Sequence, residues 1–193
     1  MKNKNIKAIL FDMVGVLLFV KPGFSPTTEE EINASHIEKL YNHTDDEKLL
    51  KDIKKYLKLK REVLEKALER IPQKFEKYDE LWKMLPQLKK NYDLAIINNG
   101  NALAMKYWSK YFDFSLFNVF TNSAQEGVKK PDPKIYLLTC KKLGVNPREC
   151  IFMDDALENI ETAQNLGMTT IWWNKEQGRE KNLKHFLQLI KNK

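Results

Sequence analysis

Short apolar segments that end in acids or amides alternate along this chain with segments of helical periodicity. The apolar segments include "KAILFD", "YDLAIINN", "ECIFMDD" and "MTTIWWN", and a shorter one lies near Val119–Thr121. Each has the length and composition of a buried β-strand rather than of a helix. Strands that alternate with helices are joined by right-handed crossovers and form a parallel sheet with helices on both faces. The sequence therefore predicts an α/β fold with a doubly wound parallel sheet.

A charged, leucine-rich stretch separates the first predicted strand from the second. From about residue 27 to residue 90, apolar residues recur every three or four positions, as in "EKLLKDIKKYLKLKREVLEKALERI" and "YDELWKMLPQLKK". This is the spacing of amphipathic helices. We expect a small helical cap over residues 21–85, inserted after the first strand, and a core formed by residues 1–20 and 86–193. The insert is expected to begin within Lys21–Pro26 and to end within Pro72–Tyr78.

The composition narrows the range of partners. The chain has 193 residues and a formal net charge of +7, but its acids and bases are mixed, without a basic block interleaved with aromatic residues. This pattern does not indicate a nucleic-acid partner. Asp12 interrupts the apolar run near the start, and no run of about 18 apolar residues indicates a membrane span. We expect a cytoplasmic protein with no membrane partner; the sequence indicates no oligomeric state.

Polar side chains follow the predicted strands, at the edge where a doubly wound sheet binds its ligands. The first strand is followed by an acid, the second by two amides, and the fourth by two acids, while a lysine precedes the helix that begins at "PDPKIY". The topology therefore brings together residues that are far apart in the sequence. These residues are Asp12, Asn98, Asn99, Lys130, Asp154 and Asp155.

The chemistry of this set points to an anionic ligand and a metal ion. Carboxylates that face one another repel unless a cation lies between them. Asp12, Asp154 and Asp155 form an all-oxygen set of the kind that binds Mg²⁺. Lys130 can offset the remaining negative charge and stabilise an anionic transition state, and Asn98 offers amide donors to phosphoryl oxygens. Asp12 can act as a nucleophile that forms a covalent intermediate.

Each of these residues, taken alone, also has a structural explanation. An acid after a strand often starts a turn, and Asp154 and Asp155 are placed to cap the helix that follows. The two amides before Gly100 are typical of a turn, and Lys130 before a proline is an ordinary surface lysine. Their joint placement at the strand ends favours a ligand site.

Four stretches resemble, in order, the four motifs of the haloacid dehalogenase-like hydrolase superfamily: "ILFDMVGVL", "AIINNG", "KKPDPKIY" and "IFMDDALENIETAQNLGMTTI". The match is best with the subgroup that carries a helical cap between the first and second motifs. This resemblance implies a Rossmann-like core, Mg²⁺ as cofactor and a cap that closes over the site. It implies Asp12 as nucleophile, Lys130 as the motif lysine, and Asp154 and Asp155 as metal-binding acids. It also implies that the backbone carbonyl of Val14 is a metal ligand.

Two positions depart from the family pattern. Phosphatases of the family usually carry a second aspartate two residues after the nucleophile, where it protonates the leaving group and then activates water; here that residue is Val14. The second motif usually ends in Ser or Thr, and here Asn98 takes that place. General acid–base help contributes ~10²–10⁴-fold to a rate, so we expect weakened catalysis, least for good leaving groups.

The favoured hypothesis is a Mg²⁺-dependent phosphatase of a small phosphorylated metabolite, acting through an aspartyl-phosphate on Asp12, with Asn98, Asn99 and Lys130 binding the phosphate. Val14 and Asn98 motivate an alternative, a low-activity or non-catalytic binding or regulatory protein of the same fold. A second alternative is a metal-independent hydrolase of the dehalogenase type. A missing acid at position 14 suits halide departure, whereas the intact pair of acids at 154 and 155 argues against it.

Overall fold

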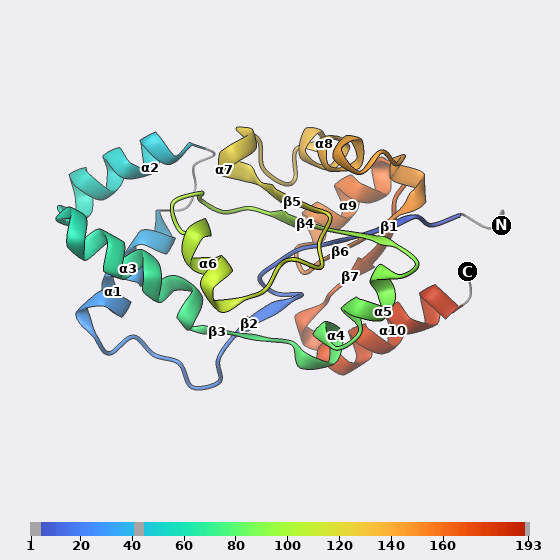
Figure 1. The fold of residues 1–193 in the computed structure, drawn as a ribbon, viewed down its shortest axis with the longest axis horizontal. Helices are drawn as coiled ribbons and strands as arrows, with labels where there is room; N and C mark the ends of the chain where they lie inside the picture. The colour runs from blue at the N-terminus through green and yellow to red at the C-terminus, as the bar shows by residue number, and fades with distance from the viewer. Residues whose placement is uncertain (1–4, 41–44, 192–193) are drawn as a thin grey trace.

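A parallel sheet forms the centre of the molecule in the computed structural model, which describes residues 5–40 and 45–191 (Figure 1). Its strand order is β5-β4-β1-β6-β7, and all of its pairings are parallel. The strands are β1 (Ala8–Phe11), β4 (Asp93–Asn98), β5 (Val119–Asn122), β6 (Cys150–Asp154) and β7 (Thr169–Trp172). Because β1 lies in the middle, the chain winds outward in both directions, which confirms the predicted α/β fold.

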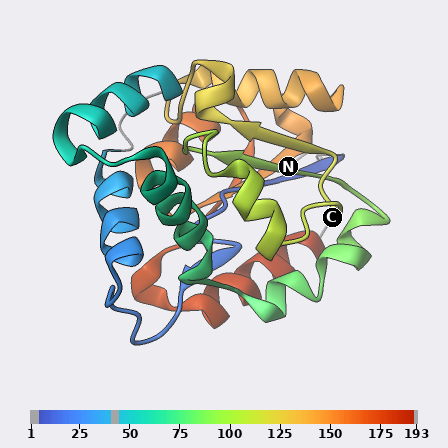
Figure 2. The same ribbon diagram turned by 60° about the vertical axis from the view of Figure 1, so that its left-hand side comes forward.

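Helices and short 3-10 segments of the core surround this sheet. They are α4 (Asp79–Trp82), α5 (Leu85–Lys89), α6 (Met105–Tyr111), α7 (Ser123–Glu126), α8 (Pro133–Leu143), α9 (Leu157–Asn165) and α10 (Arg179–Lys191), with η2 (Pro147–Glu149) and η3 (Lys175–Gln177). Helices α8 and α9 cover one face, while α5 and α10 cover the other (Figures 1 and 2). Ala8 and Leu10 pack on the first layer, and Ile9 and Phe11 on the second. Burial on both faces explains why β1 is apolar at every position.

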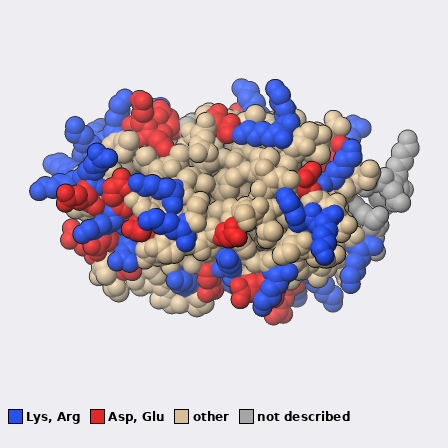
Figure 3. Space-filling view, in the orientation of Figure 1, with Lys and Arg blue, Asp and Glu red and all other residues tan. Residues whose placement is uncertain are grey.

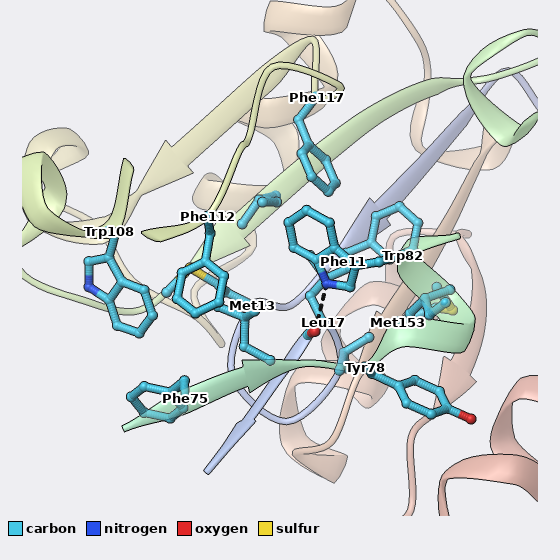
Figure 4. Packing of buried hydrophobic residues seen from close by; sticks show 14 of the residues in the cluster. Phe11, Met13, Leu17, Phe75, Tyr78, Trp82, Trp108, Phe112, Phe117 and Met153 are labelled. Atoms are coloured by element: carbon cyan, nitrogen blue, oxygen red, sulfur yellow. Dashed lines mark hydrogen bonds between the residues drawn. The ribbon is translucent and has the colours of Figure 1, made fainter. Parts of the chain in front are cut away.

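Aromatic side chains fill the second layer (Figure 4). The ring of Phe117 lies edge-on to Phe11, with centroids 5.9 Å apart, and edge-on to Trp82, at 6.2 Å. The indole Nε1 of Trp82 donates a hydrogen bond to the carbonyl of Leu17 at 2.8 Å. This contact ties α4 to the loop that follows Asp12, so packing in the core fixes the backbone next to the site.

A helical unit lies to one side of the sheet, at the left of Figure 1. It consists of α1 (Glu29–Lys39), α2 (Asp46–Asp52), the π-helical turn η1 (Ile53–Leu57) and α3 (Arg61–Gln73). Its two connections to the core pair as short antiparallel strands, β2 (Leu18–Val20) and β3 (Phe75–Lys77), which the sequence did not predict. Residues 41–44 of the predicted cap, and residues 1–4, 192 and 193 of the predicted core, lie outside the described residues.

The sequence left two expected ends for the insert, one within Pro72–Tyr78 and one at residue 85. Its long charged stretch forms two helices, because Lys58 adopts a left-handed conformation with φ of 52° directly after η1. Its last part, α4 and α5, packs on the core, where Leu81 and Leu85 are fully buried. We therefore propose that the cap ends near Gln73, with β2 and β3 as its two connections to the core.

Polar contacts hold the cap against the core. Glu65 accepts a hydrogen bond from Lys106 at 2.7 Å, and the carboxylate of Asp46 accepts from the backbone N–H of Ala102 at 3.0 Å and 3.1 Å. The second contact joins the start of α2 to the loop that follows Asn99. Lys and Arg alternate with Asp and Glu over the cap in Figure 3, as the mixed sequence predicts. No helix among the described residues is long and apolar enough to cross a membrane.

Candidate functional site

Three acids meet at the carboxyl edge of the sheet. Asp12 directly follows β1, and its backbone N–H donates to the carbonyl of Met153 at 2.8 Å, which continues the ladder between β1 and β6. Asp154 ends β6, and Asp155 comes next. One carboxylate oxygen from each acid lies within 4.8 Å of those of the other two. This spacing lets one divalent cation bind all three acids, as the sequence predicted from topology.

Lys130 lies between two of these acids. Its Nζ is 2.6 Å from Oδ1 of Asp12 and 2.7 Å from Oδ2 of Asp154, and the residue is only 3% exposed. Burial lowers the pKa of Lys130, but the two carboxylates outweigh burial and raise it above its usual value. The lysine therefore stays protonated and offsets part of the negative charge of the cluster.

The two amides after β4 have different surroundings. Asn99 accepts a hydrogen bond from the backbone N–H of Lys130 at 2.8 Å and donates one to the carbonyl of Lys130 at 2.9 Å. These bonds occupy the side chain of Asn99 and fix the backbone of Lys130, so we propose a positioning role for it. Asn98 ends β4 beside β1 and is 7% exposed, and its role as an anion-binding amide stays a prediction.

Asp154 is held through both of its carboxylate oxygens. Oδ2 accepts from Lys130, and Oδ1 accepts from the N–H of Ala156 at 2.8 Å and from Nδ2 of Asn159 at 3.0 Å. Sequence reasoning missed Asn159; the only signal was its position in the first turn of the helix after the acid pair. Both oxygens of Asp154 thus accept hydrogen bonds, and its role as a metal ligand stays a prediction, like those of Asp12 and Asp155.

Asp155 lies against the loop that follows Asp12. Its backbone carbonyl accepts from the indole Nε1 of Trp172 at 3.0 Å, and its Oδ2 lies 2.7 Å from Nζ of Lys175. Gly15, with φ of +106°, gives the carboxylate room, because a Cβ there would lie 2.4 Å from Oδ2 of Asp155. The glycine therefore serves both the turn and the close approach of the acid. Neither Gly15 nor Lys175 was predicted as part of the site.

Gly15→Ala is expected to displace Asp155, to weaken Mg²⁺ binding by about tenfold and to destabilise the protein by about 1–3 kcal/mol. Gly23→Ala is the matched control, since Gly23 also has a positive φ, of +71°, but a Cβ there meets nothing within 4 Å. Calorimetric titration with Mg²⁺ and denaturant unfolding measure the two effects. Equal Mg²⁺ affinity in the two variants contradicts a role for Gly15 in seating Asp155.

Val14 contributes no acid to the site. Its side chain is 37% exposed, and the N–H of the next residue donates to the carbonyl of Leu18 at 2.8 Å, which closes a tight loop after Asp12. An aspartate in this partly exposed position would keep some contact with water. The metal-binding role of the Val14 carbonyl stays a prediction.

The carboxyl group of Asp12 has an unusual affinity for protons. Burial is the largest cause and raises the pKa of Asp12 to about 7; Lys130 opposes this rise, whereas Asp154 and Asp155 add to it. Without a metal ion, the folded protein therefore holds a proton on this group up to near neutral pH. A bound divalent cation favours the ionised form, so protons and metal compete.

The stability of the metal-free protein is expected to fall as the pH rises from about 4 to about 7. Unfolded Asp12 ionises near pH 4, so across this window the folded state binds more protons, and Asp12 stabilises it most at low pH, by up to about 1.4 kcal/mol per pH unit. The melting temperature in EDTA should fall with this slope, by up to about 3–6 °C per pH unit. The Asp12→Asn variant should lack this contribution of Asp12 to the pH dependence. If the melting temperatures of the wild-type protein and the variant change in parallel with pH, the pKa of Asp12 is not raised.

Comparison with known proteins agrees with this geometry. A family model for haloacid dehalogenase-like hydrolases matches residues 6–167. Glyceraldehyde 3-phosphate phosphatase from Pyrococcus furiosus is 41% identical over 96 residues, which cover 47% of this chain and 39% of that protein. N-acylneuraminate-9-phosphatase from Rattus norvegicus is 31% identical over 98 residues, covering 49% of this chain and 40% of that protein. The aligned region thus spans about two fifths of the length of these relatives.

Solved structures share the fold. A HAD family enzyme from Bacteroides thetaiotaomicron, in complex with magnesium and inorganic phosphate, has a TM-score of 0.68 at 20% identity and covers 86% of this chain and 93% of that chain. A HAD-like family hydrolase from Porphyromonas gingivalis has a TM-score of 0.71 at 22% identity, with 95% and 98% covered. With the family match over residues 6–167 and the strand-end acids in place, the chain belongs to the haloacid dehalogenase-like hydrolases.

Proposed function

We propose that this protein is a Mg²⁺-dependent phosphatase of a small phosphorylated metabolite, with Asp12 as the nucleophile. One observation carries the proposal: Asp12, Asp154 and Asp155 converge within 4.8 Å of one another, with Lys130 bridging the first two. A nucleophilic carboxylate beside a cation-binding set is the arrangement that transfer of a phosphoryl group to aspartate requires.

The donor set fits Mg²⁺. All three side chains offer carboxylate oxygens, and Mg²⁺ is typically held by one or two carboxylates, water and substrate phosphate. Asp12, Asp154 and Asp155, together with the Val14 carbonyl, would hold it. When bound, the ion neutralises the phosphate oxygens and keeps Asp12 ionised, in line with the competition between metal and protons at that group.

The proposed reaction has two steps, transfer of the phosphoryl group to Asp12 and hydrolysis of the aspartyl-phosphate by water. Oδ of Asp12 attacks phosphorus, the new O–P bond forms, and the bond from phosphorus to the leaving oxygen breaks. Lys130 and Asn98 stabilise the charge on the phosphoryl oxygens. Val14 offers no proton, so the leaving oxygen is protonated by water. Water then attacks the aspartyl-phosphate, which releases inorganic phosphate and restores Asp12.

The comparisons support phosphoryl chemistry. The relatives from Pyrococcus furiosus and Rattus norvegicus are phosphatases of two different small phosphorylated compounds. The Bacteroides thetaiotaomicron enzyme binds magnesium and inorganic phosphate both as the wild-type protein and with an aspartate replaced by alanine. The activities of these relatives support a phosphatase here, and an experiment is needed to identify its substrate.

A panel of phosphorylated metabolites tests the proposal, with release of inorganic phosphate measured in Mg²⁺ and in EDTA. We expect at least one substrate to be hydrolysed in Mg²⁺, most readily one with a good leaving group such as an acyl or aryl phosphate. EDTA and the Asp12→Asn variant should both remove that activity. Turnover that persists in EDTA would count against the metal-dependent mechanism.

Val14 also keeps a second function open. A metal-independent dehalogenase has no need of an acid at this position, and a 2-haloacid dehalogenase from Pseudomonas syringae has a TM-score of 0.63 at 22% identity. The acid pair is less well explained by that reaction. Halide release from a short 2-haloacid in EDTA would favour it, and no turnover in either assay would favour a binding or regulatory protein.

A further inference from the structure

A pocket of about 380 Å³ lies beside the acid cluster, between β2, the end of β7 and the start of α10. One of its walls is Lys175, the same residue that contacts Asp155. The pocket therefore adjoins the proposed metal site without being part of the phosphate-binding set. Its lining residues are Phe19, Trp173, Lys175, Gly178, Arg179 and Asn182.

The pocket combines positive charge with aromatic walls. The guanidinium of Arg179 lies 3.9 Å from the centroid of the Phe19 ring, and no carboxylate within residues 5–40 and 45–191 lies within 4.0 Å of it. Arg179 is also the first residue of α10, where the partial positive charge of the helix is greatest. Trp173, which is only 1% exposed, closes the pocket from the inside. A ligand that fits has an anionic head and an apolar body.

Lys175 is shared between this pocket and the metal site. Its Nζ lies 2.7 Å from Oδ2 of Asp155, and its side chain is 73% exposed, so it is free to move. A divalent cation on Asp155 repels the ammonium and competes for the same oxygen. The displaced Lys175 then has the pocket beside it, which Arg179 also lines, and the two cations together favour an anionic ligand.

We propose that this pocket binds a small organic carboxylate and that Lys175 couples its occupancy to metal binding at Asp155. The two carboxylate oxygens accept from Arg179 and Lys175, while the apolar part packs on Phe19. An anion that holds Lys175 in the pocket frees Oδ2 of Asp155, so Mg²⁺ binds more tightly. By linkage, Mg²⁺ strengthens binding of the anion by the same factor. The inference rests on the metal site of the proposed function.

The test is calorimetric titration of the whole protein with Mg²⁺, alone and with benzoate near saturation. Benzoate is the probe because it joins a carboxylate to an aromatic ring, and benzyl alcohol at the same concentration is its neutral match. We expect benzoate, but not benzyl alcohol, to lower the Kd for Mg²⁺ by about fivefold. A direct titration with benzoate gives a second readout that does not depend on the metal.

Three variants identify the residues. Arg179→Leu should weaken benzoate binding and remove its effect on Mg²⁺. Lys175→Met should tighten Mg²⁺ binding by about two- to fivefold without any anion, because the competing cation is gone, and should also remove the benzoate effect. Lys7→Met is the matched control, since Lys7 forms a similar surface ion pair with Glu149 at 2.7 Å, outside the pocket lining. It should change neither the affinity for Mg²⁺ nor the effect of benzoate on that affinity.

The outcomes separate this inference from the proposed function. Failure of Mg²⁺ to bind overturns the metal-dependent phosphatase. Mg²⁺ binding that benzoate leaves unchanged, benzoate binding that Arg179→Leu leaves unchanged, or an absence of benzoate binding overturns the pocket alone. Normal Mg²⁺ affinity in Lys175→Met overturns the coupling through Lys175.

Discussion

Asp12→Asn is expected to lower kcat for any phosphate ester that the protein hydrolyses by at least about 10³-fold, because the amide cannot attack phosphorus. The substitution keeps the shape of the side chain and removes the charge that Lys130 contacts at 2.6 Å. Lys130 keeps its second partner, Asp154, at 2.7 Å, so the cluster should not collapse. Phosphate release at saturating substrate, with p-nitrophenyl phosphate as the generic case, measures the effect.

Two controls separate chemistry from folding. Asp113→Asn changes an aspartate that is fully solvated and accepts only a local bond from Ser115 at 2.9 Å, so it should retain activity. The Asp12→Asn protein should still bind Mg²⁺, more weakly because one carboxylate ligand is lost, and inorganic phosphate in calorimetry. Loss of both binding and turnover indicates a damaged site, and unchanged turnover shows that Asp12 is not the nucleophile.

The acid cluster could be predicted because it depends on topology. Asp12 and Asp154 stand at the ends of two strands, and any parallel pairing of those strands brings them to one edge. The structure pairs Phe11 with Met153, which makes the two acids neighbours. Lys130 could be placed at that edge only because the crossover connections return the chain to the same edge of the sheet. No local sequence pattern indicated its contacts with the two acids.

The supporting contacts could not be predicted, because they join segments without a local signal. Asn99 fixes the backbone of Lys130 across 31 positions of sequence, and Lys175 reaches Asp155 from a 3-10 turn after the last strand. Gly15 was visible as a turn residue, but its second role follows only from the position of the Asp155 carboxylate. Such contacts depend on loop geometry, which apolar periodicity does not encode.

The cap boundary illustrates the same limit on a larger scale. Helical periodicity runs through Trp82 and Leu85 as it does through α3, so it could not decide between an end of the insert within Pro72–Tyr78 and one at residue 85. The indole of Trp82 instead donates to Leu17 and packs against Phe117, which places α4 in the core. Tertiary packing decides whether a helix joins the cap or the core, whereas an amphipathic pattern shows only that one face of the helix will be buried.

Val14→Asp is expected to raise kcat most for substrates with poor leaving groups, toward the ~10²–10⁴-fold that general acid–base help contributes. An alkoxide needs a proton in order to depart, whereas an aryl oxide leaves largely without one. The gain should therefore be large for glycerol 3-phosphate and small for p-nitrophenyl phosphate. The position tolerates an acid, because the Val14 side chain is 37% exposed and a carboxylate there remains hydrated.

Val14→Asn is the matched control, since asparagine has the size and polarity of aspartate but cannot donate a proton as an acid. A gain shared by both variants points to polarity or water access at the rim rather than to proton transfer. A gain confined to Val14→Asp, with a pH–rate profile that falls as the new acid ionises, identifies the missing proton donor as what limits the natural protein. If alkyl phosphates gain nothing while the acid is correctly placed, proton delivery is not the limiting step.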